Sequence, residues 1–354
     1  MIRLSKRTDG MRPIYSFLIR VGSILFALLL GALLLLVLGY PPFKSYATII
    51  DGSLGSANFV RATAKLAIPL LGCALAIAPC FKMHFWNIGA EGQITAGAIG
   101  ATLIVIYWGD KLSPVPLLLL MALASIIFGG VCGLIPGFFK AKWNTNETLF
   151  TLMMNYILIG IVKWLQGGPW ERGVPGSQKI GPFVYAAKLP EVLGIHCGWI
   201  IVLILTVLMF IYMNYSKHGY QIAVIGDSAN TARYAGINVG HVIMRTLFLS
   251  GAISGFIGFI TVSGVNHTLN DSVANGVGFT AITVAWLAHL NPFMMIIIAS
   301  MLAILQKGSL TLKSRIGVPN TISQILTGLI LLCMLSCEFF INYKLTIHHK
   351  KEVS

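Results

Sequence analysis

The sequence is poor in charge. Only 10% of its 354 residues are charged and 56% are hydrophobic, whereas an ordinary soluble domain has about 25% charged residues. A soluble fold of this length cannot bury so many apolar side chains. Apolar stretches of about 20 residues recur along the chain, which is the length that crosses a bilayer as a helix. The composition therefore predicts an all-α, polytopic transmembrane helical bundle.

The usual motifs of hydrolytic chemistry are also missing. The sequence contains no phosphate loop of the form G-x-x-x-x-G-K-[ST], no H-E-x-x-H and no G-x-S-x-G. Without a phosphate loop the chain cannot hydrolyse ATP by that route. We therefore expect no catalytic residue in this chain, and we expect it not to be an enzyme.

The six cysteines form neither a disulfide framework nor a zinc pattern. Cys333 and Cys337 are one helical turn apart and would suit a metal only with further ligands nearby. Cys197 falls at the edge of a predicted outer loop. The others lie in or at the edges of apolar spans and are interpreted as apolar filler: Cys73, Cys80 and Cys132. We expect no metal site.

The net charge of +14 does not indicate a nucleic-acid partner here. The basic residues lie mostly at span ends, where anionic lipid and the positive-inside bias account for them. The basic N-terminus precedes the apolar run 21–38, and no small-residue cleavage site follows it. We therefore expect a retained first span rather than a signal peptide.

Hydropathy predicts ten spans in one domain, residues 1–354. Their ranges are 17–39, 63–80, 86–108, 115–139, 148–166, 198–214, 243–264, 276–290, 292–307 and 320–342. The charge bias near the first span places three segments in the cytoplasm, 1–16, 215–242 and 343–354. Lys307, Lys313 and Arg315 violate that bias. They suggest that the last three spans are divided wrongly, with a re-entrant piece among them.

The stretch His218–Gly240 is long and polar between two apolar segments, so it lies outside the lipid. Asp227 or Ser228 is a suitable N-cap for about two helical turns over 229–235. Gly236 suits the end of that helix. Two interpretations stay open, a docking element for a partner or a simple connecting loop.

A second polar cluster opens the span at 86–108. Asn87, Glu91 and Gln93 lie among glycines at its start, and a charge at the bilayer centre costs about 2.5–3.5 kcal/mol on insertion scales. One interpretation is a broken helix on a translocation pathway. The other is a helix start capped by Asn87, with Glu91 at the N-terminus and glycines packed against neighbours.

Broken helices are also indicated by two short spans, 276–290 and 292–307, joined only by Asn291-Pro292. Short or Gly/Pro-interrupted spans are typical of transporters. The Gly-rich starts of the spans at 86–108 and 276–290 suggest equivalent points of an internal repeat.

Three further clusters have mainly structural interpretations. Thr145 or Asn146 is a suitable N-cap with Glu147 in the first turn, and a gating or inter-subunit role of Glu147 and Asn155 is compatible with that. Small residues at 251, 255 and 258 indicate close helix packing. The last cluster would need more ligands to hold a metal and is otherwise a solvated outer loop: His267, Asn270 and Asp271.

Four stretches together resemble the permease subunits of bacterial ABC importers for nucleosides and simple sugars. They are FWNIGAEGQITAGAIGA, NETLFTLMMNYI, GYQIAVIGDSANTARYAGINVG and GVPNTISQILTGLILL, in that order. The resemblance covers about residues 60–335. The run NIGAEGQ resembles the nucleoside-type branch.

The resemblance implies a permease in the bacterial cell membrane that translocates nucleosides by alternating access. Its implied partners are a second, related permease subunit, two ABC ATPase subunits and an extracytoplasmic substrate-binding lipoprotein. This chain would bind no cofactor, because ATP and Mg would be held by the ATPase. The alternatives are an importer of simple sugars of the ribose or galactose type and an ion-coupled secondary carrier.

The resemblance also implies residue roles. The matching segment of the family is the coupling helix, in which Arg233 would meet a carboxylate of the ATPase. The other coupling residues would be Asp227, Asn230, Ala232, Tyr234 and Gly236. The pathway residues would be Asn87, Glu91, Gln93, Glu147, Asn155 and Phe279. The sequence departs from the family at Trp286 and His289, where smaller residues are usual.

Overall fold

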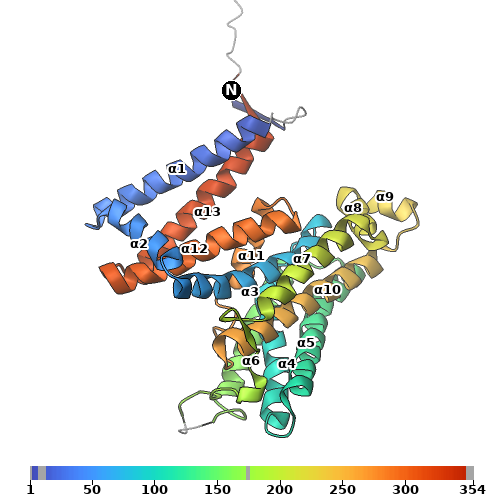
Figure 1. The fold of residues 1–354 in the computed structure, drawn as a ribbon. Helices are drawn as coiled ribbons and strands as arrows, with labels where there is room; N and C mark the ends of the chain where they lie inside the picture. Colours follow the sequence, from blue (N-terminus) through green and yellow to red (C-terminus); the bar gives the residue numbers. More distant parts are fainter. Residues whose placement is uncertain (1, 7–12, 173–175, 348–354) are drawn as a thin grey trace, which may run out of the picture. The chain divides into compact units, whose positions relative to one another are not determined.

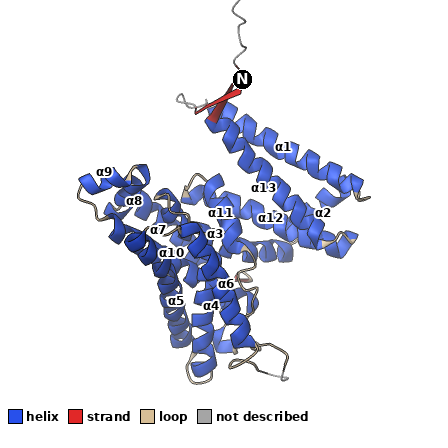
Figure 2. Cartoon of the chain, turned by 180° about the vertical axis from the view of Figure 1, so that it is seen from behind, coloured by secondary structure: helices blue, strands red, loops and turns tan. Residues whose placement is uncertain are grey.

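The computed structural model describes residues 2–6, 13–172 and 176–347. Most of the basic N-terminus and the last residues of the tail therefore lie outside the described residues. The described part of the chain is predominantly helical (Figures 1 and 2). The principal helices are α1 (Pro13–Val37), α2 (Pro42–Leu54), α3 (Ala57–Lys82), α4 (Ala90–Trp108), α5 (Pro114–Trp143), α6 (Glu147–Gln166), α7 (Gly198–Tyr215), α8 (Lys217–Asp227), α9 (Ala229–Tyr234), α10 (Val239–Ile260), α11 (Val277–Leu287), α12 (Pro292–Ile316) and α13 (Asn320–Asn342).

The remaining elements are small. The antiparallel pair β1 (Ile2–Lys6) and β4 (Tyr343–Ile347) joins segments near the two ends of the chain. The second pair, β2 (Glu191–Val192) and β3 (Ile195–His196), follows the short 3-10 helix η1 (Tyr185–Ala187). A single π-helical segment, η2 (Thr261–Asn266), continues α10.

The helices confirm an all-α, multi-pass membrane protein. Each of the ten predicted spans overlaps a helix. Among the described residues, seven helices are long and apolar enough to cross a membrane, or eight if the bent pair α1–α2 is one span. That pair turns by 117°. Because α11 has only 11 residues, it is too short to cross alone.

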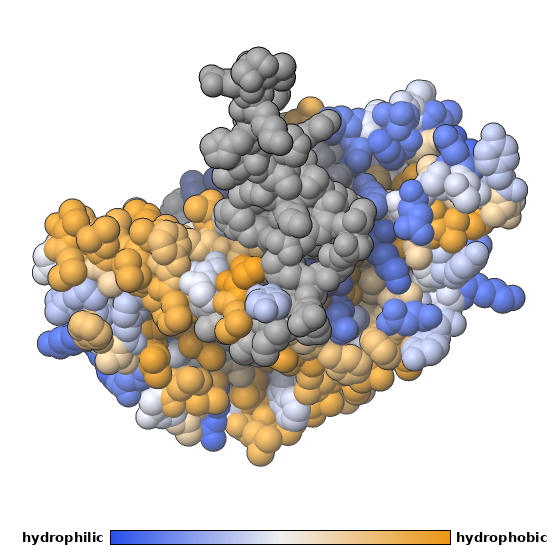
Figure 3. All heavy atoms as spheres, turned by 90° about the horizontal axis from the view of Figure 1, so that it is seen from above, coloured by the Kyte–Doolittle hydropathy of each residue, from blue (hydrophilic) through white to orange (hydrophobic). Residues whose placement is uncertain are grey.

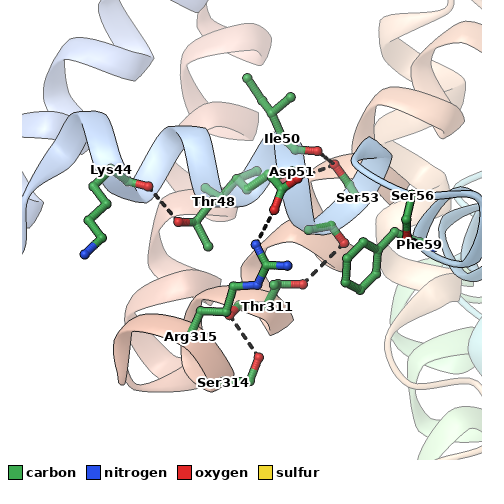
Figure 4. Close-up of polar contacts among 12 residues, drawn as sticks. Lys44, Thr48, Ile50, Asp51, Ser53, Ser56, Phe59, Thr311, Ser314 and Arg315 are labelled. Atoms are coloured by element: carbon green, nitrogen blue, oxygen red, sulfur yellow. Dashed lines mark hydrogen bonds and ion pairs between the residues drawn. The ribbon is translucent and has the colours of Figure 1, made fainter.

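The Cα positions divide the chain into two compact units, each described here by itself. The first comprises Met1–Val60 and Ile304–Ser354. In it α1 runs alongside α13, and α2 packs on the C-terminal part of α12. Thr311 donates to the Gly52 carbonyl at 3.3 Å, and Arg315 forms an ion pair with Asp51 (Figure 4). The prediction of a single domain stays a prediction.

This contact corrects one span boundary. The ninth predicted span ended at residue 307, but α12 continues to Ile316. Lys313 and Arg315 lie in its last turn, where Arg315 also lies over the Phe59 ring at 5.6 Å. The basic cluster therefore belongs to one long helix that pairs with α2, so the ninth span was divided wrongly, as the charges suggested.

The second unit comprises Arg61–Ala303 and centres on α10, which packs along α4 and α5. The packing is close because glycines meet: a Cβ at Gly255 would collide with the Ser125 carbonyl, and one at Gly97 with Gly255. The structure thus confirms the close packing predicted for 251, 255 and 258. Helix α10 is mostly buried, whereas α5, α6 and α7 keep apolar side chains exposed. Apolar residues cover much of the surface visible in Figure 3.

Candidate translocation site and coupling segment

Glu91 is the central polar group of the second unit. It lies in the first turn of α4 and is only 5% exposed. One carboxylate oxygen accepts the backbone N–H of Gly276 at 2.7 Å, and the other accepts that of Gly278 at 2.7 Å. These are N–H groups at the start of α11, which have no partner within their own helix. The carboxylate therefore holds the N-terminus of the short helix α11, where negative charge is favourable. We call this pair of hydrogen bonds the Glu91 clamp.

The clamp depends on two glycines. Gly276 has a φ of +76°, a left-handed conformation that glycine adopts readily. Gly278 faces the backbone of Glu91 so closely that a Cβ there would collide with it. The Gly-rich start noted at residue 276 is thus required by the approach of α4 to α11.

Asn155 on α6 holds the segment that precedes α4. Its Oδ1 accepts the Gly92 N–H at 2.8 Å, and its Nδ2 donates to the Ile88 carbonyl at 3.0 Å. Thr151, one turn earlier, accepts the Ile88 N–H at 3.2 Å. The irregular connector 83–89 between α3 and α4 is therefore fixed by side chains of α6, as required where backbone groups leave a helix inside a membrane.

Asn87 bonds to the start of α4, as the capping interpretation held, and it also bonds across helices. The N-cap position of α4 is Gly89, which has no side chain, and Asn87 Oδ1 accepts the Gly89 N–H at 3.0 Å. Asn87 Nδ2 donates to Ser250 on α10 at 3.1 Å, and its amide group also contacts that of Gln93 at 3.3–3.4 Å. The network is buried and ties the connector to α10. The structure thus brings together Asn87, Glu91, Gln93 and Asn155.

Three aromatic rings form a cluster where the connector meets the C-terminal part of α11. Trp86, on the connector, stacks on Trp286 of α11 with a centroid distance of 5.5 Å and an interplanar angle of 23°. Phe81 of α3 contacts both indoles at 5.7 and 5.9 Å. Trp86 is 45% and Trp286 41% exposed. Sequence reasoning singled out Trp286 only as a departure from the family, and no local pattern links it to a residue 200 positions earlier.

The predicted Glu147 cluster lies apart from this network, at the end of the unit where α5 stops and α6 begins. Asn146 Oδ1 accepts the Leu149 N–H at 3.2 Å, which confirms Asn146 as the N-cap. Glu147 forms an ion pair with Lys140 of α5 at 2.8 Å. Both line a cavity of about 630 Å³ that also reaches Arg233.

The stretch His218–Gly240 forms two helices, α8 and α9, rather than one. Ser228 caps α9, since its Oγ accepts the Thr231 N–H at 3.2 Å. Asp227 is instead the last residue of α8, so it does not cap α9 as one prediction held. Gly236, with a φ of +76°, follows the end of α9 as predicted.

The outward face of α9 is polar and aromatic. Ala232 is fully buried and packs in the chain's own core with Ile222 and Val239. Ala232 therefore faces the chain's own core, and its coupling role stays a prediction. Arg233 and Asn230 lie outside, 3.3 Å apart, and Tyr234 is 94% exposed. Figure 1 shows α9 at an end of the unit.

The opposite end of the unit holds a second cavity of about 400 Å³, lined by Gln166, His267 and Asn270 among others. Nearby, His196 is buried, and neither ring nitrogen has a partner among the described residues. Burial, with the positive charge of Lys65, lowers the pKa of His196 to about 4. The imidazole is therefore neutral at physiological pH. Within the described ranges no three His, Cys, Asp or Glu side chains gather as metal ligands.

Comparison with known proteins gives a match over most of the chain. Residues 59–335 match the family described as "Branched-chain amino acid transport system / permease component". The guanosine ABC transporter permease protein NupP of Bacillus subtilis is 29% identical over 328 residues, 90% of this chain and 93% of that protein. No solved structure matches.

Two other relatives are similar over most of their length. The nucleoside ABC transporter permease protein NupB of Lactococcus lactis subsp. cremoris is 27% identical, covering 93% of this chain and 92% of that protein. The glucose ABC transporter permease protein TsgB13 of Haloferax volcanii is also 27% identical, covering 92% and 89%. The named substrates of these relatives thus include both nucleosides and a sugar.

Proposed function

Because the chain belongs to the permease family described as branched-chain amino acid transport system permease component, we propose that it is the nucleoside-translocating permease of an ATP-driven importer. As a member of that family it is a transport component and not an enzyme. The nucleoside choice is supported by the relatives named for guanosine and nucleosides. The run NIGAEGQ, which carries the Glu91 clamp, also supports it.

One observation carries the coupling part of the proposal. Helix α9 is short, capped, and exposes Arg233 and Tyr234 away from the chain's own core. Arg233 offers a planar guanidinium that binds a carboxylate with two hydrogen bonds. The ATPases would dock on α9 from the cytoplasm and hold ATP and Mg. The second permease and an extracytoplasmic binding lipoprotein would complete the importer.

The proposed mechanism is alternating access. Helices α7 and α10 flank α8–α9 in the chain, so movement of a docked ATPase would reach them directly. Arg245 of α10 donates to Gln221 of α8 at 3.2 Å, a polar connection between α8 and the long buried helix. In turn, α10 contacts Asn87 through Ser250. A change at the coupling segment would thus reach the connector and α11, provided the two states differ in these contacts.

The pathway residues of the proposal are those of this network, Glu91, Asn87, Gln93, Asn155 and Phe279. The first four hold the connector and α11 in place, and Phe279 is exposed on α11. Glu147 belongs to the cytoplasmic end, beside the cavity that reaches Arg233. The cell membrane is the site of action, and the cytoplasmic side is the end that carries α8 and α9.

The test is reconstitution of the chain with its ATPase and permease partners in proteoliposomes, with the binding lipoprotein supplied outside. We expect uptake of guanosine and uridine that requires ATP, and little uptake of ribose or glucose. Uptake of nucleosides by this chain without ATP or partners would identify a secondary carrier instead. ATP-driven uptake of sugars alone would favour the second candidate, a sugar importer, which the glucose permease relative supports.

A further inference from the structure

Helix α11 presents a face that the clamp does not use. Phe279 and Trp286 are seven residues apart, which places them on the same side two turns apart. Both are exposed, at 44% and 41%, whereas Gly278, Ala281, Val284 and Ala285 on the other side are buried. Between the two rings the face carries Thr283, which is half-buried. Ile282 on the same side is also half-buried, so the exposed face of this short helix is aromatic with one hydroxyl and one aliphatic side chain.

This aromatic face extends beyond α11. Trp86 stacks on Trp286 from the connector, and the buried ring of Phe81 supports both indoles from behind. The connector lacks helical hydrogen bonds at this point: the Asn87 N–H bonds to the Phe85 carbonyl and the Ile88 N–H to the Trp86 carbonyl. The two stacked indoles thus belong to two interrupted segments, the connector and α11, which contact each other at this point.

The composition of the face differs from that of the exposed side of α7. The exposed side of α7 is a run of aliphatic side chains that includes Ile204, Val207, Leu208 and Ile211. Helix α11 is too short to present such a run across a bilayer. At its N-terminus, the Gly276 N–H donates to the buried carboxylate of Glu91. Interrupted segments inside a membrane protein are tolerated where they are buried or line a water-filled path.

We propose that the exposed face of α11, with the stacked Trp86–Trp286 pair, is a stacking surface for the base of a nucleoside in transit. The two indoles select flat aromatic bases over sugars, and Thr283 offers a hydroxyl to a polar edge. This inference rests on the proposed nucleoside-import function. An aromatic face suits this task because stacking on it tolerates any base. A permease must also release its substrate, which requires contacts of moderate strength.

The experiment uses the whole reconstituted importer and measures initial rates of guanosine uptake over a range of concentrations. The variants are Trp286→Ala, Trp286→Phe and Trp86→Ala. Trp108→Ala is the matched control, since Trp108 is 43% exposed and lies at the far end of α4. We expect Trp286→Ala to lower the ratio of kcat to KM for guanosine about tenfold, which is about 1.4 kcal/mol. Trp86→Ala has a similar effect, whereas Trp286→Phe and Trp108→Ala stay within about threefold of the wild type.

A second measurement separates a stacking role from a structural one. ATP hydrolysis and co-purification of the ATPase are measured for each variant, and both should stay at the wild-type level. Guanosine uptake by Trp286→Ala at the wild-type rate would overturn the inference. So would a parallel loss of uptake and assembly in Trp286→Ala that Trp286→Phe shares, because the indole then serves only packing. Absence of nucleoside uptake by the wild-type importer would instead contradict the proposed function itself.

Discussion

Glu91 shows how one side chain organises a membrane-embedded site. Its carboxylate accepts two backbone N–H groups of a helix that begins 185 residues later, both at 2.7 Å. Buried charge is costly unless it is hydrogen-bonded, and here the two bonds and the helix N-terminus compensate it. The residue positions α11, and through α11 it positions Phe279 and Trp286. Glu91 therefore affects transport indirectly, by fixing the position of α11.

The first prediction concerns the substitution Glu91→Gln. An amide presents an oxygen to one N–H but an NH₂ to the other, so one buried N–H of α11 loses its partner. We expect a loss of about 1–3 kcal/mol of stability, measured as a lower thermal midpoint in detergent, together with reduced uptake by the assembled importer.

A matched control for that substitution is Glu171→Gln. Glu171 also accepts a backbone N–H, that of Gln178 at 2.9 Å, but in an exposed loop. Its replacement should change stability by no more than about 0.5 kcal/mol. If the two variants had equal thermal midpoints, the clamp would not hold α11 as argued.

Several residue roles follow from sequence and others do not. The N-cap Asn146 and the stop Gly236 are predictable because capping uses neighbours in the chain. The partners of Glu91 and Asn155 are not predictable, since local patterns say nothing of contacts across helices. Asn87 illustrates the difference: its bond to the Gly89 N–H at the start of α4 is local and predictable, whereas its bond to Ser250, 163 residues away, is not.

At the scale of elements, α10 is held by close glycine contacts together with buried large side chains such as Leu247 and Ile257. Gly251 faces Gly129 and Gly133, while Gly255 lies against Ser125 and Gly129. In a membrane, helices associate through van der Waals contacts of this kind, because lipid is as apolar as the side chains. The spacing of these glycines is visible in the sequence, which is why this packing could be predicted.

Two other features of the helices could not be predicted from the sequence. Helix α2 turns away from α1 by 117°, and α8 precedes α9 as a separate helix. Neither has the 20-residue apolar run that hydropathy detects. Their amphipathic character becomes informative only once the surfaces against which they pack are known.

The prediction at this scale compares two glycines. In Gly255→Ala the new methyl group meets the Ser125 carbonyl and the backbone of Gly129, so α5 and α10 must separate. We expect a destabilisation of about 1–3 kcal/mol or more from overpacking. In Gly160→Ala on α6 no heavy atom lies within 4 Å of the new Cβ.

The control Gly160→Ala should change stability in the opposite direction. Alanine favours a helix over glycine by about 0.5–1 kcal/mol, so Gly160→Ala should be neutral or stabilising. The measurement is the thermal midpoint of each purified variant. A Gly255→Ala protein as stable as Gly160→Ala would show that α5 and α10 are not in tight contact.

At the scale of the whole molecule, the chain is a membrane-embedded transport component of a permease family. The polar residues discussed above lie in two separate regions. The buried network around Glu91 lies inside the second unit, and the exposed residues of α8 and α9 lie at an end of it. Helix α10 connects these two places, since it contacts both.

The central claim is that ATP-driven import depends on α9, and the most direct measurement is the initial rate of ATP-driven guanosine uptake by reconstituted importers. They contain the wild-type chain, Arg233→Glu or the control Lys217→Glu. Lys217 is exposed in α8 and receives the same charge change. Losing an interfacial ion pair costs about 2–5 kcal/mol, so Arg233→Glu should lower uptake and ATPase co-purification more than tenfold, with Lys217→Glu near the wild type. Normal assembly and normal ATP-driven uptake in Arg233→Glu would contradict the account.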